Sequence, residues 1–337
     1  MQGMTRKRRR IVLGAFCFLG VVLSQEPLTA AEYGLGDYLL GYTIPMSGYT
    51  PPPGVYLTES AYFYKGSASN NPDRTFQLGR ITATGISYSF LSDITTISWF
   101  TDAKILGGTF GLAATVPFML ERTSASVAFT GLLGVNRQFG RTDSDASIGD
   151  SAFSAILGWQ QSEHHWNLTV TGFAPTGDYD PDKIAFTSLH RPAVDVKGAY
   201  TFLSLTTGTE VSAALGVTFN TINTLTNYLS GNELHFEWAL NQHFPNGFSL
   251  GVGGFLYQQL NGDSGSGNRI GPFIGRVASV GPLAGYTFKA LDREISISAR
   301  WFHEFAVERR VRGDSIFATL TLPLSPASAL PKPATTK

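Results

Sequence analysis

Hydrophobic and polar residues alternate one for one along much of the chain. In residues 233–242, Leu234, Phe236, Trp238 and Leu240 alternate with His, Glu, Ala and Asn. Successive side chains of a β-strand point to opposite faces, so this pattern predicts a strand with one apolar and one polar or small face. The same alternation occurs in residues 166–171, 211–220, 294–305 and 315–324. The chain is therefore predicted to be all-β.

Three features favour a membrane barrel over a soluble β-sandwich. The predicted strands are typically 9 to 13 residues long, which matches the roughly 9–11 tilted residues that cross the hydrocarbon layer of a bilayer. Short and long connections alternate along the chain. Aromatic residues gather near strand ends, as the two interfaces of a membrane require. These aromatic residues are Tyr200, Phe202, Phe219, Phe244, Phe248, Tyr286, Phe288, Trp301 and Phe305.

The connection lengths also predict an orientation. Short turns fall near residues 162–164, 205–208, 245–246 and 290–293, and longer polar loops fall at residues 175–191, 221–231, 261–271 and 308–313. Bacterial barrels have short periplasmic turns and longer outer loops. We therefore expect residues 54–324 to form an antiparallel transmembrane β-barrel of the outer-membrane type, with the last strand returning to the periplasmic side.

The number of strands is predicted to be 12 or 14. Nine strands can be counted from residue 151 to residue 324, and residues 54–65, 105–118 and 126–135 also have strand patterns. Residues 80–90 and 94–100 are less regular. Both termini of such a barrel lie in the periplasm, which requires an even number of strands. The count is 14 if the two irregular segments are both strands, and 12 if they are not.

The two ends of the chain are predicted to lie outside the barrel. A basic run at residues 6–10, an apolar run at residues 11–23 and small residues up to Ala31 are typical of a secretory signal peptide, here residues 1–31. Its removal takes away Cys17, the only cysteine, and leaves a net charge of −4, which does not suggest a nucleic-acid partner. Residues 32–53 are rich in Gly and Pro, and are expected to be a periplasmic lead-in or a plug folded into the lumen. Residues 325–337 are expected to be a disordered periplasmic tail.

Several stretches of the chain resemble the family of meta-pathway phenol degradation proteins, which are outer-membrane barrels. The matching stretches are residues 51–54 with Tyr56, residues 104–108, residues 174–180, and residues 275–277 with residues 281–282. They occur in the family's order and cover most of the mature chain. The resemblance implies transport of aromatic or other hydrophobic compounds across the outer membrane. Unlike the common outer-membrane pattern, the last strand here ends at Leu324 without a terminal Phe.

Charged and imidazole side chains on the polar strand faces are the candidate lumen residues. Charge on the lipid face costs about 2–4 kcal/mol at the bilayer midplane, so these side chains should point inward. They either line a permeation path or pair with one another across the lumen. The candidates are Glu59, Asp195, Lys197, Glu210, His235, Glu237, Glu294, Arg300 and Glu304.

The loop at residues 175–191 is a candidate gate. Asp178, Asp180 and Asp182 alternate within it, beside Tyr179. These carboxylates could hold Ca²⁺, although the loop lacks the Gly and the distal Glu of an EF-hand. We favour a solvated acidic loop, or bridging to lipopolysaccharide through divalent ions. No catalytic, cofactor-binding or metal site is expected.

The sequence therefore favours an outer-membrane channel for passive uptake of small hydrophobic or aromatic compounds. Its expected partners are outer-membrane lipid and lipopolysaccharide, the small-molecule permeant, and the barrel-assembly machinery during biogenesis. The alternatives are a general diffusion porin and a structural or adhesive barrel with a plugged lumen. An outer-membrane phospholipase is less favoured, because no Ser lies at a defined spacing from His235 or His303.

Overall fold

A computed structural model describes residues 28–30, 36–68, 74–78, 80–83, 85–130, 136–272, 274–290 and 292–325. The predicted signal peptide falls outside the described residues except for residues 28–30, and the predicted tail except for Ser325. Among the described residues, no helix is long and apolar enough to cross a membrane.

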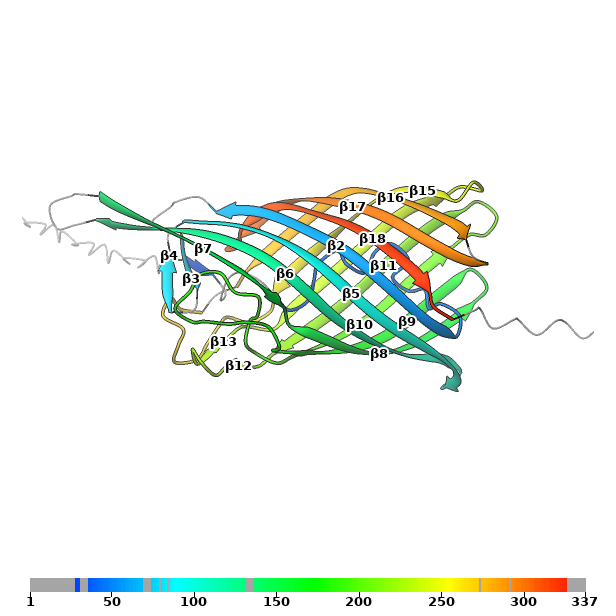
Figure 1. The fold of residues 1–337 in the computed structure, drawn as a ribbon, viewed down its shortest axis with the longest axis horizontal. Coiled ribbons are helices and arrows are strands. Elements are labelled where there is room, and N and C mark those ends of the chain that lie inside the picture. Colours follow the sequence, from blue (N-terminus) through cyan, green and yellow to red (C-terminus); the bar gives the residue numbers. More distant parts are fainter. Residues whose placement is uncertain are drawn as a thin grey trace, which may run out of the picture.

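The described strands form a closed, antiparallel barrel of 12 strands (Figure 1). Its strands are β2 (Gly54–Ala68), β5 (Gly85–Ile105), β6 (Gly108–Thr130), β7 (Asn136–Ile148) with β8 (Ser151–Gln161), β9 (His164–Ala174), β10 (Ala193–Leu203), β11 (Thr209–Asn220), β14 (Glu233–His243), β15 (Phe248–Gln259), β16 (Arg276–Ala290), β17 (Arg293–Glu308) and β18 (Arg312–Pro323). Strand β2 pairs with both β18 and β5, which closes the barrel.

Strands β7 and β8 are two parts of one interrupted strand. Both pair with β6, β7 along its later half and β8 along its earlier half. The interruption lies at Gly149 and Asp150, where the Gly149 amide donates a hydrogen bond to the Pro117 carbonyl at 2.8 Å. Only β8 pairs with β9, so β7 forms with β6 a hairpin that projects beyond the barrel (Figure 1).

The lower of the two predicted strand counts is the observed one, and all nine strands predicted after residue 150 are present. Most of the two irregular segments lies in the single strand β5, and residues 81–83 form the separate strand β4. The prediction of separate strands at residues 105–118 and 126–135 was wrong, because residues 108–118 and 126–130 both belong to the single strand β6. Strands β5 and β6, with 21 and 23 residues, are longer than a membrane crossing requires. Their outer halves therefore lack the strict alternation that contact with lipid imposes.

The two ends of the barrel differ. At one end, which we call the turn end, the strands are joined by short turns, and at the other, the loop end, by longer connections (Figure 1). The loop end carries a small sheet of β1 (Leu28–Ala30), β3 (Arg74–Leu78) and β4 (Ile81–Ala83), and the pair β12 (Ile222–Asn223) and β13 (Tyr228–Leu229). Here Asp263 accepts hydrogen bonds from the Tyr228 hydroxyl (2.6 Å) and the Gly231 amide (2.8 Å), and burial raises the pKa of its carboxyl.

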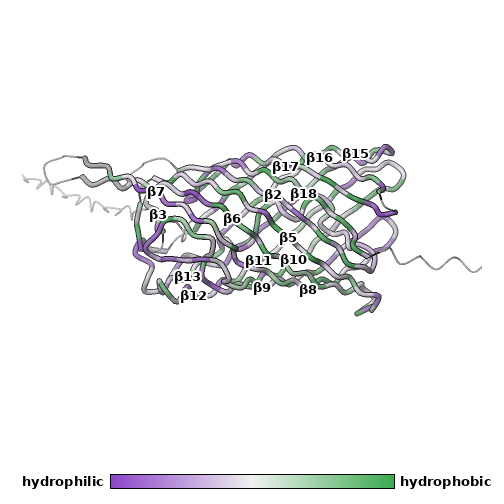
Figure 2. Tube along the Cα trace, viewed as in Figure 1, coloured by the Kyte–Doolittle hydropathy of each residue, from purple (hydrophilic) through white to green (hydrophobic). Residues whose placement is uncertain are grey.

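The barrel strands from β8 to β18 present an apolar face outward and a more polar face to the lumen, and Figure 2 shows this alternation along the strands. On β9 and β10, Val170 and Val196 are paired across the strands and are 42% and 40% exposed. The neighbouring pair, Thr169 and Lys197, is buried inside the barrel. An apolar outer surface of this kind is stable only against lipid, which agrees with the predicted orientation of the strand faces.

Candidate functional site

The lumen of the barrel contains an extended stretch of the chain itself. Residues 36–53, which we call the luminal segment, run through it from the loop end to the turn end. Near its start, Asp37 lies 3.3 Å from Arg191 in the loop before β10. Near its end, the ring of Tyr49 lies 5.1 Å from that of His165, beside the β8–β9 turn. Strand β2 then begins at the turn end.

Two carboxylates of the barrel wall bind the backbone of the luminal segment. Glu237 on β14 accepts hydrogen bonds from the Gly41 amide (2.8 Å), the Thr43 amide (3.2 Å) and the Thr43 hydroxyl (2.7 Å). Glu210 on β11 accepts one from the Met46 amide at 2.7 Å. The segment forms no strand here, so its amides need other acceptors, and ionised carboxylates are strong ones.

A buried arginine holds the carbonyls of the same stretch. Arg300 on β17 donates to the Tyr42 carbonyl (2.9 Å) and to the Ile44 carbonyl, and also to the Thr319 hydroxyl at 2.9 Å. Its guanidinium lies 4.7 Å from the centre of the Phe317 ring. Carboxylate acceptors and a guanidinium donor on nearby strands thus bind the amides and the carbonyls of the middle of the segment.

Other contacts hold the two ends of the segment. The ring of Tyr38 stacks on that of His235 at 3.5 Å between ring centres, and His235 is bonded to Asp195 at 2.7 Å. Towards the turn end, the Gly48 amide donates to the Thr201 hydroxyl at 2.9 Å, and the Ser47 carbonyl accepts from Asn167 at 2.8 Å. The segment is therefore bound along its whole length.

The predicted lumen residues have several different roles. Glu210, Glu237 and Arg300 bond the luminal segment directly, His235 stacks on it, and Asp195 positions His235. The Lys197 ammonium lies 5.5 Å from the centre of the Tyr38 ring. Glu304 bonds to the wall instead, at the Tyr64 hydroxyl (2.9 Å). Glu59 does not face the lumen as predicted: it shares the outward face of β2 with the exposed Phe63, where its carboxylate accepts a hydrogen bond from the Thr95 hydroxyl on β5 (2.9 Å). Glu294 is exposed at the turn end.

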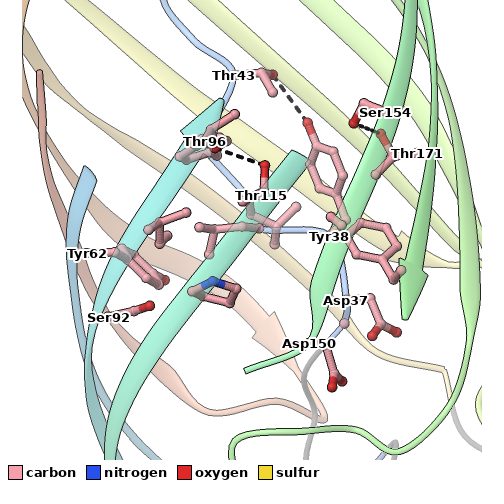
Figure 3. Close-up of a pocket in the computed structure, with 18 of the residues that line it drawn as sticks. Asp37, Tyr38, Thr43, Tyr62, Ser92, Thr96, Thr115, Asp150, Ser154 and Thr171 are labelled. Carbon is pink, nitrogen blue, oxygen red and sulfur yellow. Dashed lines mark hydrogen bonds between the residues drawn. The ribbon is translucent and has the colours of Figure 1, made fainter. Parts of the chain in front are cut away.

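A cavity of about 500 Å³ remains between the luminal segment and one side of the wall (Figure 3). Strands β2, β5, β6, β8 and β9 supply most of that wall, and the segment itself supplies the other side. The cavity runs from residues near the loop end, such as Glu304, to residues near the turn end, such as Tyr49 and Phe100. It is therefore an elongated cavity that follows the segment along the barrel, and we call it the passage.

Aromatic rings and small hydroxyl side chains dominate this wall. Tyr62, Tyr64, Tyr88 and Phe90 form an aromatic group near the loop end, with the Tyr62 and Phe90 ring centres 4.9 Å apart and those of Tyr88 and Phe90 5.3 Å apart. Further along, hydroxyl groups are bonded to one another across neighbouring strands. These pairs, drawn in Figure 3, are Thr96–Thr115 at 2.9 Å and Ser154–Thr171 at 2.8 Å.

The predicted gating acids do not line the cavity. Asp182 lies 3.4 Å from Arg80 on the outside, Asp180 accepts the Asp182 amide at 2.9 Å, and the carbonyl of Asp178 accepts two amides of its own loop. The ring of Tyr179 stacks on that of His190 at 5.3 Å. These side chains stabilise the loop rather than face a permeant.

A neighbouring stretch of the same loop reaches the cavity. Phe186, Thr187, Ser188 and Leu189 line it and are buried. Asp150, at the interruption between β7 and β8, accepts the Gly177 amide (3.1 Å) and the Leu189 amide (2.9 Å), and so holds both ends of the loop. The signal that could have indicated this was the mostly apolar run of residues 184–189 inside an otherwise polar loop.

Neither a metal site nor a catalytic pair is found in the part of the chain that the structure describes. No group of three or more potential ligands could hold a metal ion there, and no serine hydroxyl is bonded to a histidine ring. The exposed His303 is bonded to Asp314 at 2.9 Å and contacts Arg312. The lumen is occupied by the luminal segment, and a narrow passage lined by aromatic residues lies beside it.

The fold is similar to that of a solved outer-membrane channel. The fold matches the COG4313 outer membrane channel from Pseudomonas putida F1 with a TM-score of 0.64 at 15% identity, over 83% of this chain and 98% of that one. A Pseudomonas aeruginosa FadL homologue matches with a TM-score of 0.44 at 10% identity, over 88% and 98% of the two chains. The first match shows a shared barrel fold. No functionally curated protein matches the sequence.

The sequence matches the model of one protein family over most of its length. The model described as "Putative MetA-pathway of phenol degradation" matches residues 32–320, which include the luminal segment and almost all of the barrel. The chain therefore belongs to this family of outer-membrane-type barrels.

Proposed function

We propose that the protein is an outer-membrane channel for passive uptake of small hydrophobic compounds, aromatic ones among them. The observation that carries the proposal is the aromatic passage beside the luminal segment, whose wall includes Tyr62, Tyr64, Tyr88 and Phe90. Ligand sites for apolar molecules are concave and lined by aromatic and apolar side chains with few polar groups. The family and the channel of similar fold support the same role.

The size of the passage supports selective rather than general diffusion. A cavity of about 500 Å³ holds one small aromatic molecule, whereas a general porin needs a wide aqueous channel. The luminal segment fills the rest of the lumen and is bonded to the wall on several sides. In the expected orientation, a permeant enters at the loop end and leaves near Tyr49 at the periplasmic turn end.

The test measures uptake of an apolar fluorescent probe, such as N-phenylnaphthylamine, by intact Gram-negative cells that produce the protein. Thr115→Trp should reduce uptake several-fold, because Thr115 lines the passage. Val116→Trp is the matched control, since the neighbouring Val116 is 42% exposed on the outer surface. Equal uptake by producing and non-producing cells would refute the proposal. Rapid entry of polar solutes such as nitrocefin would favour the general porin instead.

A further inference from the structure

Arg310 is a cationic side chain in the passage that the described contacts leave without an acceptor. It lies in the connection of residues 309–311 between β17 and β18 at the loop end, and it lines the cavity. Its guanidinium carbon lies 4.1 Å from the centre of the Tyr257 ring on β15. This stacking holds the flat group in place without using any of its N–H donors.

Two of the three guanidinium nitrogens of Arg310 have unused hydrogen-bond donors. Its Nε and Nη1 atoms are buried and have no hydrogen-bond partner, and no ion pair involving Arg310 occurs within the described residues. The other buried luminal arginines differ: Arg191 lies 3.3 Å from Asp37, and Arg300 donates to three oxygens. A buried guanidinium whose donors lack acceptors is costly unless a further group satisfies it.

The carboxylates nearest to Arg310 bond to other groups. Glu304 accepts hydrogen bonds from the Tyr64 hydroxyl (2.9 Å) and the Gly313 amide (2.8 Å). Glu233 lies 3.9 Å from Arg191 and 3.4 Å from the Asn220 amide group. Both act on Arg310 through space only. They partly balance its charge without occupying the fork of N–H groups that a carboxylate binds.

We propose that Arg310 binds the carboxylate of an amphipathic permeant whose apolar body lies against Tyr62, Tyr64, Tyr88 and Phe90. The inference rests on the proposed function and specifies its substrate class as small aromatic or apolar carboxylates. The nearby acids weaken the attraction, so the carboxylate is held briefly at the loop end and then released along the passage. A channel needs such binding, favourable enough for entry and weak enough for exit.

The experiment measures reversal potentials in planar bilayers that hold the full-length protein, with sodium benzoate on one side and sodium chloride on the other. Only ions carry current, so benzoic acid crossing the lipid as a neutral molecule does not contribute. The wild-type protein should pass benzoate at least as readily as the smaller chloride ion. Arg310→Met should lower the benzoate-to-chloride permeability ratio about tenfold, because a charge-assisted bidentate contact is lost.

Two variants serve as comparisons. Arg276→Met makes the same change at an exposed arginine that pairs with Glu308, and should leave the ratio unchanged. Arg310→Lys keeps the charge but not the planar fork, and should give an intermediate ratio. Gel mobility of unheated samples checks that each variant folds into a barrel.

Benzyltrimethylammonium, a ring-bearing cation, separates binding of the carboxylate from a change in pore shape. If Arg310→Met lowers the permeability of this cation as much as that of benzoate, the residue shapes the pore and the inference is wrong. A wild-type benzoate ratio below one that Arg310→Met does not change also overturns it. In either case the proposed function still stands if the apolar probe enters cells through the wild-type protein and not through Thr115→Trp.

Discussion

The two sides of the lumen use their side chains in opposite ways. On the side of β11, β14 and β17, Glu210, Glu237 and Arg300 are buried charges that bond to the backbone of the luminal segment. On the side of β2, β5 and β6, rings such as Tyr62 and Tyr88 face the segment across a cavity. Charge in this lumen therefore holds a piece of the protein in place, and the less polar side is left free for a permeant.

The largest expected effect follows from removing the carboxylate that binds the middle of the luminal segment. Glu237→Ala removes the acceptor of three hydrogen bonds. This should weaken the hold on the segment by about 3 kcal/mol, which corresponds to roughly a hundredfold more opening. Maleimide labelling of a Ser47→Cys reporter measures it, because Cys17, the only native cysteine, lies in the predicted leader. Glu294→Ala, at an exposed glutamate, is the control, and equal labelling in both variants would contradict the anchoring role.

Arg300→Met tests the hydrogen bonds that the wall donates to the carbonyls of the same stretch. It removes the donor to the carbonyls of Tyr42 and Ile44 and to Thr319, while a methionine retains much of the apolar stem. We expect a weakening of about 2 kcal/mol, or roughly thirtyfold faster labelling of the same Ser47→Cys reporter. Arg293→Met, near the turn end, should have little effect. Slower labelling in the Arg300 variant would show that the arginine does not hold the segment.

The loop over the passage should depend on Asp150. Asp150→Ala leaves the amides of Gly177 and Leu189 without their acceptor, which should loosen the loop locally by about 1–2 kcal/mol. Hydrogen exchange at these two amides should accelerate, while exchange in β9 and β10 stays the same. The comparison variant is Asp178→Ala, since no described residue donates a hydrogen bond to the Asp178 carboxylate. If exchange at the two amides accelerates equally in both variants, Asp150 does not hold the loop more strongly than the predicted gating residue Asp178.

The smallest effect is expected on the aromatic side. Tyr88→Leu keeps the residue apolar but removes a ring that lies 5.3 Å from Phe90. Aromatic contacts contribute about 0.5–1.5 kcal/mol beyond their buried area. Uptake of an aromatic probe relative to an aliphatic one should therefore fall about threefold. Phe63→Leu, on the outward face at 40% exposure, is the control, and an equal change in both variants would argue against a luminal aromatic site.

Much of the barrel could be predicted because the same requirement, one face to lipid and one to the lumen, applies to every membrane-crossing strand. Each membrane-crossing residue of β9 to β18 faces either lipid or lumen, so the alternation around Val170 and Val196 determines the strand faces directly. The constraint is absent beyond the membrane, and there the prediction divided β5 and β6 into pieces. The candidate site was only partly predictable, since Glu237 and Arg300 could be placed inside the barrel but not matched to a partner.

The sequence by itself determined the fold class, the direction of most strand faces and the inward position of the charged candidates other than Glu59. These properties follow from local periodicity and from the cost of charge in lipid. Only the tertiary structure decided that residues 36–53 occupy the lumen, that Glu210, Glu237 and Arg300 bind them, and that Phe186 and Leu189 line the passage. Gly41 and Glu237 are 196 positions apart in the chain, and no local pattern encodes a contact between residues so distant.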